Sequence, residues 1–206
     1  MAQITSGLRA VLSLPRMYDL VQDLVGAERL RRLLVRDHLR PNAGQRLLDI
    51  GCGTARILPH LPAEVHYVGV DLSPAYIDAA QAEFAGRGEF HCLDIGQSTA
   101  RAFRDFDLAV ATGLLHHLDD HEVIAMLHTA REALAPGGRL TTIDPCLARG
   151  QSRLAAFIIK RDRGQNVRTP TAYLQLAQQV FPQASVQVRN DMLRIPYNHA
   201  ILECRR

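Results

Sequence analysis

The sequence has almost no lysine, no closely spaced cysteines and no long apolar run. Lys160 is the only lysine, and the formal net charge is only +3. This charge is too small to indicate a nucleic-acid partner. No apolar run approaches the roughly 18 residues needed to cross a bilayer, so we expect no membrane partner. The apolar patch at Val11–Leu14 has no small-residue cleavage site beside it, which argues against a signal peptide.

The cysteines are spaced too widely to form a metal or disulfide framework. They are Cys52, Cys92, Cys146 and Cys204, with no CxxC pair among them. This spacing indicates free buried thiols in a reducing cytoplasm, and we expect no metal site. A chain of 206 residues suits one α/β domain with a substantial core. We therefore predict a single domain over residues 1–206.

From residue 45 onward, short apolar runs alternate with segments of helical periodicity. This alternation is typical of a parallel sheet wrapped by helices. The runs are almost continuously apolar, which fits strands that are covered on both faces. The strands are predicted at Gln45–Ile50, Val65–Val70, Gly88–Leu93, Asp107–Thr112 and Gly138–Asp144.

Helix boundaries can be read from capping residues. Ser73 and Pro74 begin a helix that Gly86 ends, and a longer helix begins at Asp119-Asp120 and stops at Pro136-Gly137-Gly138. Residues 1–43 are predicted to form a helical cap, whose best candidates are Tyr18–Val25 and Ala27–Leu39.

The last quarter of the chain differs from the alternating pattern. The segment TPTAYLQLAQQVF is helical, and it is followed by two strands, ASVQVRND and YNHAILECR. Two successive strands without room for a helix form an antiparallel hairpin. The sheet should therefore be mostly parallel, with one reversed strand near its C-terminal edge. Residues 146–169 are predicted to form a helical insertion between the fifth strand and this region.

The stretch LLDIGCGTAR at residues 47–56 places an acid directly before a glycine loop. A phosphate loop would need a lysine, and none is present here. The dinucleotide fingerprint GxGxxG needs a third glycine where this chain has Arg56, which also disfavours a nicotinamide oxidoreductase. A carboxylate at the strand end would repel a pyrophosphate but suits a cationic ligand.

Residues 49–55 resemble the Asp/Glu-x-Gly-x-Gly-x-Gly loop of the class I S-adenosylmethionine (SAM) methyltransferases. Ala55 replaces the last glycine, at a position that we expect to need a small side chain more than a positive φ. The resemblance implies an α/β, Rossmann-like, seven-stranded sheet with helices on both faces and an N-terminal helical lid. It also implies SAM as cofactor and S-adenosylhomocysteine as product. A helix N-terminus after the loop should offer unpaired N–H groups.

The resemblance covers roughly residues 44–145 and extends to the other strand ends. It assigns Asp71 to the ribose hydroxyls, Asp94 to the adenine amino group and the Ile95 N–H group to the adenine ring. Open α/β sheets bind ligands at the carboxyl ends of their strands, which supports this grouping. The predicted cofactor-binding residues are Asp49, Gly51, Cys52, Gly53, Asp71, Leu72, Asp94, Ile95 and Gly113.

His116 and His117 are the candidate catalytic bases, since they follow the fourth strand, where the acceptor should lie. Methyl transfer is an in-line displacement, and it needs a base only if the acceptor must lose a proton. The alternative is that one histidine only packs against or caps the next helix. The run HHLDDH could suggest a metal, but Asp119 and Asp120 are better explained as helix-capping acids.

Acceptor contacts are expected from the segments outside the shared core. Tyr18 is either a lid residue or an ordinary half-buried helix tyrosine. The insertion carries six basic residues against Asp162, with Arg163 and Arg168 as candidate contacts for an anionic acceptor. The alternative is a solvated helix face. The stretch DRGQNVR in this insertion resembles one that recurs in small bacterial methyltransferases acting on metabolites.

The leading hypothesis is a SAM-dependent methyltransferase acting at oxygen, nitrogen or carbon of a small molecule. A non-catalytic SAM-binding protein and a methyltransferase acting on a macromolecule are the alternatives. Methylation of base amino groups is disfavoured, because Thr112-Gly113-Leu114-Leu115 stands where an Asn/Asp-Pro-Pro-Tyr motif is expected. The acceptor and the oligomeric state stay open.

Overall fold

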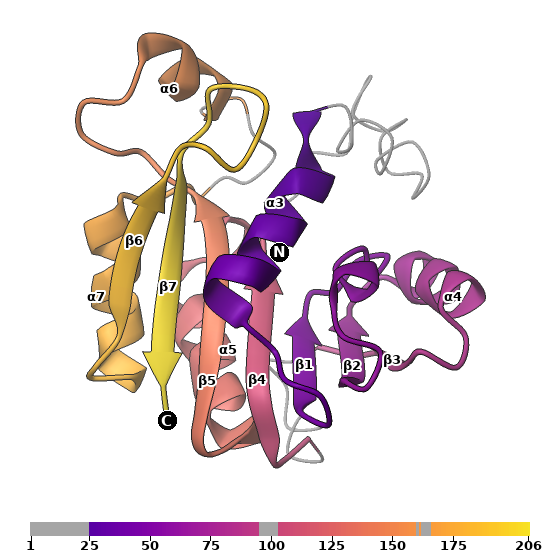
Figure 1. The fold of residues 1–206 in the computed structure, drawn as a ribbon. Coiled ribbons are helices and arrows are strands. Elements are labelled where there is room, and N and C mark those ends of the chain that lie inside the picture. The colour runs from indigo at the N-terminus through magenta and orange to yellow at the C-terminus, as the bar shows by residue number, and fades with distance from the viewer. Residues whose placement is uncertain (1–24, 95–102, 160, 162–165) are drawn as a thin grey trace.

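A seven-stranded sheet forms the centre of the computed structural model, which describes residues 25–94, 103–159, 161 and 166–206. The strand order is β3-β2-β1-β4-β5-β7-β6 (Figure 1). Strands β1 to β5 are parallel, and β7 runs antiparallel to both β5 and β6, so the predicted reversed strand is confirmed. The strands are β1 (Arg46–Ile50), β2 (His66–Asp71), β3 (Gly88–Cys92), β4 (Phe106–Thr112), β5 (Leu134–Pro145), β6 (Ser185–Arg189) and β7 (His199–Arg205).

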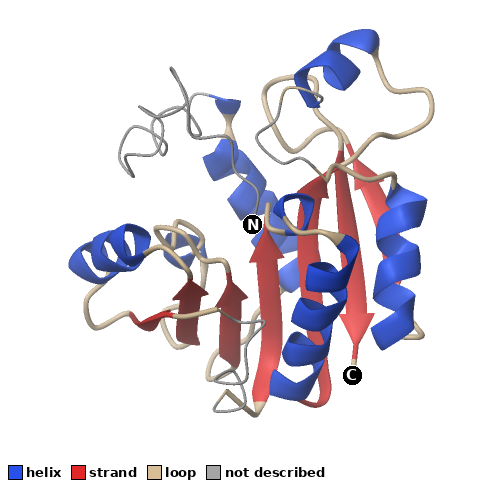
Figure 2. Cartoon of the chain, turned by 180° about the vertical axis from the view of Figure 1, so that it is seen from behind, coloured by secondary structure: helices blue, strands red, loops and turns tan. Residues whose placement is uncertain are grey.

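Helices cover both faces of the sheet, as predicted. Neighbouring β1 residues point to opposite faces: Leu47 packs in a cluster with Leu34, and Leu48 in a cluster with Met126. In Figures 1 and 2, α3 lies on one face and α5 and α7 on the other. Buried Ala80 places α4 on the α3 side. The helices are α3 (Ala27–Leu34), continued by η1 (Val35–Leu39), α4 (Pro74–Glu83), α5 (Asp120–Ala133), α6 (Arg153–Ile159) and α7 (Pro170–Val180).

The helix starts follow the capping residues in the sequence. Ser73 caps α4 by accepting a hydrogen bond from the Tyr76 N–H group. Asp119 and Glu122 form a capping box at the start of α5, so the acids after His117 are engaged in the helix start. In the described ranges, no group of three or more His, Cys, Asp or Glu residues could hold a metal ion.

One expected helix is absent because of proline, and another ends slightly earlier than expected. After β1, the chain forms only the three-residue 3₁₀-helix η2 (Leu58–His60), since Pro59 and Pro62 leave no room for an α-helix. Helix α5 ends at Ala133, and the residues through Pro136 and Gly138 already belong to β5. A Cβ at Gly138 would lie 2.8 Å from the Phe106 carbonyl oxygen, so this close strand contact requires glycine. The cysteines are free, as predicted, but only Cys146 and Cys204 are buried, whereas Cys52 is half-buried and Cys92 is exposed.

Helix α6 lies at the edge where the parallel strands end (Figure 1). Ala155 and Ile159 are buried, whereas Leu154 and Phe157 are 55% and 52% exposed. The helix therefore presents apolar side chains to solvent at the edge that carries the glycine loop. No helix in the described part of the chain is both long and apolar enough to cross a bilayer.

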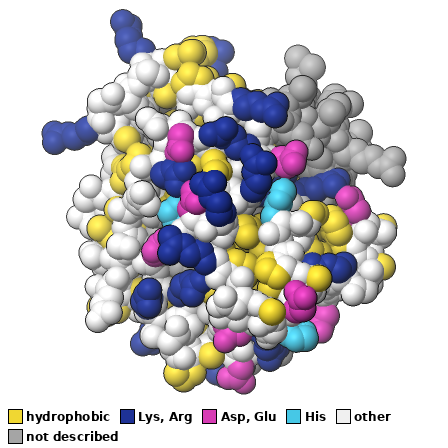
Figure 3. Space-filling model, viewed as in Figure 1, with side chains coloured by type: hydrophobic (Ala, Val, Ile, Leu, Met, Phe, Trp, Pro, Cys, Tyr) yellow, Lys and Arg dark blue, Asp and Glu magenta, His cyan; other side chains and the backbone are white. Residues whose placement is uncertain are grey.

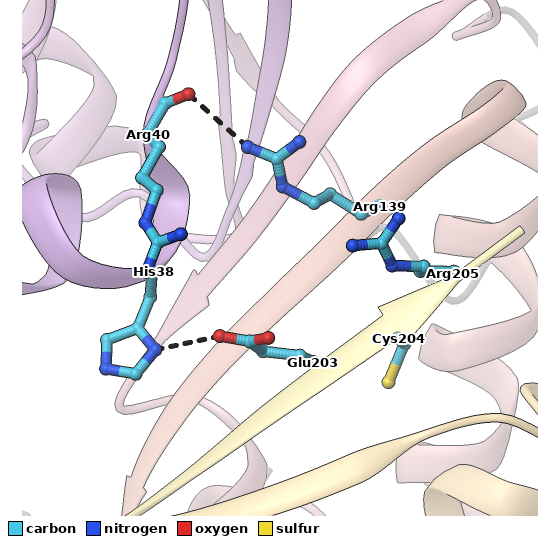
Figure 4. A pocket seen from close by; sticks show the side chains of 6 residues that line it. All are labelled: His38, Arg40, Arg139, Glu203, Cys204 and Arg205. Atoms are coloured by element: carbon cyan, nitrogen blue, oxygen red, sulfur yellow. Dashed lines mark hydrogen bonds and ion pairs between the residues drawn. The ribbon is translucent and has the colours of Figure 1, made fainter.

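A basic hollow lies at the opposite edge, where the parallel strands begin (Figure 4). Figure 3 shows arginine side chains gathered on the α3 side of the molecule. Arg139 donates to the carbonyl oxygens of Leu39 and Arg40, and His38 Nδ1 lies 2.8 Å from Glu203 Oε1. These contacts attach the end of η1 to β5 and β7. The remaining lining residues are Cys204 and Arg205.

Candidate functional site

The glycine loop after β1 is fastened to the end of β2 by backbone hydrogen bonds. The N–H groups of Gly51 and Cys52 donate to the Val70 carbonyl at 2.8 and 3.0 Å. Gly51 and Gly53 have φ values of 71° and 54°, which only glycine adopts readily. A Cβ at Gly51 would lie 3.1 Å from Leu114, whereas one at Gly53 would meet nothing within 4 Å. The loop therefore leaves open space above Gly53.

Ala55 corrects one sequence-based expectation. Its φ is 56° and its side chain is fully buried, so this position requires both a small side chain and a positive φ. A left-handed conformation costs an L-residue roughly 1–2 kcal/mol. The loop keeps the backbone geometry of the glycine that Ala55 replaces, at the cost of some strain.

Ala55→Val should destabilise the protein by about 2 kcal/mol or more, because a β-branched side chain would be strained and overpacked at this site. Ala55→Gly is the matched control. It should stay within about 1 kcal/mol of wild type, since relief of strain offsets the loss of one buried methyl group. Urea unfolding measures both variants. Equal stability of the valine variant and wild type would show that the positive φ is not required.

Asp49 is a buried carboxylate at the end of β1. Its side chain accepts a hydrogen bond from the Tyr67 hydroxyl at 2.7 Å, its only such partner among the described residues. Burial raises the pKa of Asp49, the Tyr67 hydrogen bond opposes this shift, and the nearby Asp71 carboxylate adds to it, so that the pKa is about 7. Two carboxylates beside one loop favour a cationic ligand.

Asp71 connects the end of β2 to the glycine loop. One carboxylate oxygen accepts from the Gly53 N–H group and the other from the Ser73 N–H group, both at 2.9 Å. Each oxygen has a second lone pair, so the carboxylate can still accept from ligand hydroxyls. The neighbouring Leu72 is 41% exposed, which provides an apolar surface next to the carboxylate.

The structure describes three further predicted cofactor-binding residues, Asp94, Gly113 and Cys52. Asp94 is half-buried just beyond β3, and Gly113 follows β4 with a φ of 64°. The Cys52 thiol lies beside Gly69, where an added Cβ would come within 2.9 Å of the sulfur. Burial raises the pKa of this thiol. Ile95 lies outside the described residues, as do the predicted acceptor contacts Tyr18 and Arg163.

His116 and Asp144 form a buried pair across the ends of β4 and β5. His116 Nδ1 lies 2.9 Å from Asp144 Oδ1, and the His116 backbone N–H group donates to the same oxygen at 3.1 Å. Because a carboxylate accepts, Nδ1 carries the hydrogen in the neutral ring, and Nε2 is the basic nitrogen. His117 is half-buried, and its ring centroid lies 4.0 Å from that of His116.

Arg168 makes contacts other than the predicted acceptor contact. Its side chain is 10% exposed, and its guanidinium donates five hydrogen bonds to protein oxygen atoms. A guanidinium has five N–H groups, so none is left for an acceptor. This geometry argues against the role predicted from the sequence.

Sequence reasoning missed two members of the site, Asp144 and Tyr67. Asp144 is an acid at the carboxyl end of a strand, the same signal that selected Asp71 and Asp94, so it could have been found. Tyr67 gave no such signal, because its hydroxyl reaches Asp49 across neighbouring strands.

Comparisons with known proteins agree with this geometry. Residues 48–140 match the model of a family described as a methyltransferase domain. This range contains the glycine loop and the ends of β1 to β4. Residues 48–140 belong to the class I SAM-dependent methyltransferases.

The chain is similar to both curated relatives and solved structures of methyltransferases. It is 33% identical over 146 residues to the O-methyltransferase rstn1 of Aspergillus nomiae, covering 66% of this chain and 61% of that protein. The pyocyanin biosynthetic protein PhzM aligns with a TM-score of 0.73 at 15% identity, covering 92% of this chain and 58% of that one. The structure of human N-acetylserotonin methyltransferase in complex with SAM aligns with a TM-score of 0.65 at 18% identity. This alignment covers 93% of this chain and 55% of that one. The chain thus spans less than two thirds of these proteins.

The residues of this methyltransferase domain fit SAM. Asp49 is a buried carboxylate suited to a cation, Asp71 retains acceptor capacity for hydroxyls, and the space above Gly53 is open. Exposed Leu72 would lie against an apolar ring. One predicted contribution is missing, because η2 does not provide the N-terminus of an α-helix after the loop.

Proposed function

We propose that this protein transfers the methyl group of SAM to a hydroxyl oxygen of a small molecule. The observation that carries the proposal is the buried His116–Asp144 pair, which lies at the same sheet edge as the glycine loop. The similarity to fungal O-methyltransferases supports an oxygen acceptor. Neither a nucleic acid nor a membrane is part of the proposal.

In this proposal, one set of residues binds the cofactor and another set removes the proton of the acceptor. Asp49 and Asp71 would hold the cofactor, while the loop around Gly53 lets backbone approach it closely. SAM, when bound, supplies a methyl group on a sulfonium, whose methyl–sulfur bond breaks so that neutral S-adenosylhomocysteine leaves. His116 would accept the hydroxyl proton at Nε2, while Asp144 holds Nδ1 and stabilises the charged ring.

The exposed surface of α6 supports an apolar acceptor that carries an anionic group. Leu154 and Phe157 are exposed at this sheet edge, and the Arg161 guanidinium lies 4.2 Å from the centroid of the Phe157 ring. Arg153 is also exposed on the same helix. An acceptor with an aromatic or aliphatic body and a carboxylate or phosphate would match these side chains.

Thermal unfolding with three ligands tests the cofactor assignment. SAM and S-adenosylhomocysteine should each raise the melting temperature, and NAD should not, since only ligands that bind the folded state stabilise it. A screen of hydroxylated acceptors with and without anionic groups then tests transfer. Equal stabilisation by NAD contradicts the cofactor assignment. Stabilisation by SAM without transfer to any acceptor would favour a non-catalytic SAM-binding protein.

Asp71→Ala is expected to weaken SAM binding more than tenfold, because ribose hydroxyls would lose their acceptor and the Gly53 N–H group its partner. Isothermal titration calorimetry measures the effect. Glu83→Ala is a control near the loop, since Glu83 pairs with half-buried Arg56 and makes no contact with Asp71 in the described structure. Near-wild-type affinity of the Asp71 variant would contradict its placement at the ribose.

A further inference from the structure

The Arg168 guanidinium spans both ends of the turn that carries His116. It donates to the carbonyl oxygens of Leu115 at 2.9 Å and of Leu118 at 2.8 Å. The other bonds go to the Asn166 carbonyl at 3.1 Å and to Asp120 Oδ1, which accepts at 2.9 Å from Nε and at 2.7 Å from a terminal nitrogen. One planar group therefore binds the residues just before and just after the two histidines.

The turn itself is too short to hold its own geometry. It is a three-residue 3₁₀-helix, η4 (Leu115–His117). Its backbone bonds run from His117 N to Leu114 O at 3.0 Å and from Leu118 N to Leu115 O at 3.2 Å. Short 3₁₀ turns have poor hydrogen-bond geometry. The position of His116 therefore depends on contacts from outside the turn.

The segment containing Arg168 also connects this turn to β5. The Asn166 N–H group donates to the His116 carbonyl at 3.0 Å, and the Leu147 N–H group donates to the Arg168 carbonyl at 3.1 Å. Arg168 also forms an isolated parallel bridge with Cys146, two residues beyond Asp144. Residues 166–168 thus lie between the strand end that carries Asp144 and the turn that carries His116.

We propose that Arg168 is a positioning residue that holds His116 in register with Asp144, an inference that rests on the proposed role of His116 as the base. Arg168 acts through the turn and does not touch the acceptor. The proposal gives a physical role to the end of the DRGQNVR stretch. Lysine could not replace it, because a single ammonium group cannot bridge both carbonyls in the planar geometry of a guanidinium.

Histidine-ring NMR of the ligand-free protein tests the proposal without any methyl transfer. The protein has nine histidines, so the His116 signals are assigned by their loss in His116→Gln. Wild type should show one His116 tautomer with a slowly exchanging Nδ1–H proton. Arg168→Lys and Arg168→Ala should lose this protection or show both tautomers. If the alanine variant does not fold, the lysine variant decides the outcome.

Two variants serve as matched controls. Arg139→Ala removes another arginine that binds backbone carbonyls, at the opposite sheet edge, and should leave the His116 signals unchanged. Asp120→Asn removes the carboxylate partner, whose side chain is 72% exposed, but keeps the carbonyl contacts, and it should behave like wild type.

Steady-state kinetics provide the second measurement. The Arg168 variants should lower kcat at least tenfold, since misplacing a catalytic group is costly, with KM for SAM within about twofold of wild type. Unchanged His116 signals in both Arg168 variants, or an equal loss of kcat in Arg139→Ala, would overturn the proposal. If wild type methylates no acceptor, the proposed function fails, while the NMR comparison still decides whether Arg168 positions His116.

Discussion

Replacing His116 with alanine is expected to slow methyl transfer to a hydroxyl acceptor by about 10²- to 10⁴-fold, the usual contribution of a general base. SAM binding should change by less than about twofold, because the His116 side chain is held by Asp144 at the ends of β4 and β5, whereas Asp49 and Asp71 lie at the ends of β1 and β2. Single-turnover rates with saturating SAM measure the chemical step directly. An acceptor with a free amine that is neutral at the assay pH should be affected less, because it need not lose a proton before attack.

Two further variants, Asp144→Asn and His117→Ala, distinguish the role of His116 from the roles of the two residues beside it. An asparagine at residue 144 can donate to Nδ1 and so favour the tautomer with hydrogen on Nε2, which abolishes the basic nitrogen. We therefore expect Asp144→Asn to lose rate nearly as strongly as His116→Ala. His117→Ala removes only a neighbouring ring and should lose much less. A rate unaffected in His116→Ala would remove this residue as the base, and a larger loss in His117→Ala would transfer the role.

The sheet could be predicted from the sequence because its signals are local and repeated. Each predicted parallel strand lies within a few residues of the observed one, since buried apolar runs ending in an acid or glycine have few other interpretations. The reversed strand followed from the short distance between the last two runs. The helix after β1 was wrong, because it was expected from the glycine loop alone, without regard to Pro59 and Pro62.

The site was predicted where single residues follow strands, and missed where it depends on contacts between distant segments. Asp49 and Asp71 lie at strand ends, which the topology brings to one edge. Arg168, in contrast, was grouped with the other basic residues of its segment by charge alone. Its contacts with Leu115 and Leu118 cross about fifty residues of chain and go to backbone carbonyls, which every residue possesses. No side-chain pattern could have indicated them.

Asp49→Asn is expected to weaken SAM binding by about 100-fold and yet to stabilise the ligand-free protein at pH 8. The first effect follows because a buried carboxylate facing a cation contributes a charged interaction that an amide cannot replace. The second follows because burial raises the pKa of Asp49 to about 7, so the ionised form is unfavourable in the folded protein. An asparagine of nearly the same shape removes that penalty.

The pKa of Asp49 also predicts how protein stability and stabilisation by SAM change with pH. The folded pKa of about 7 lies above the unfolded value near 3.9, so the folded state holds the proton more tightly. Wild-type stability should therefore fall, relative to Asp49→Asn, as the pH rises from about 4 to 7, and the difference between the two should level off below pH 4. Stabilisation by SAM should increase over the same range, because the cation favours the ionised carboxylate.

Tyr67→Phe distinguishes this titration from other ionisations in the protein. The Tyr67 hydroxyl donates to Asp49 and opposes the effect of burial, so its loss should raise the Asp49 pKa further and move the SAM-linked midpoint to higher pH. Melting temperatures with and without SAM between pH 5 and 8 measure the shift. A midpoint unmoved by Tyr67→Phe, or an Asp49→Asn variant that binds SAM like wild type, would show that this carboxylate does not face the sulfonium or ammonium. If Asp49→Asn instead stabilises the ligand-free protein and weakens SAM binding, the Asp49 carboxylate serves ligand binding and lowers the stability of the ligand-free fold.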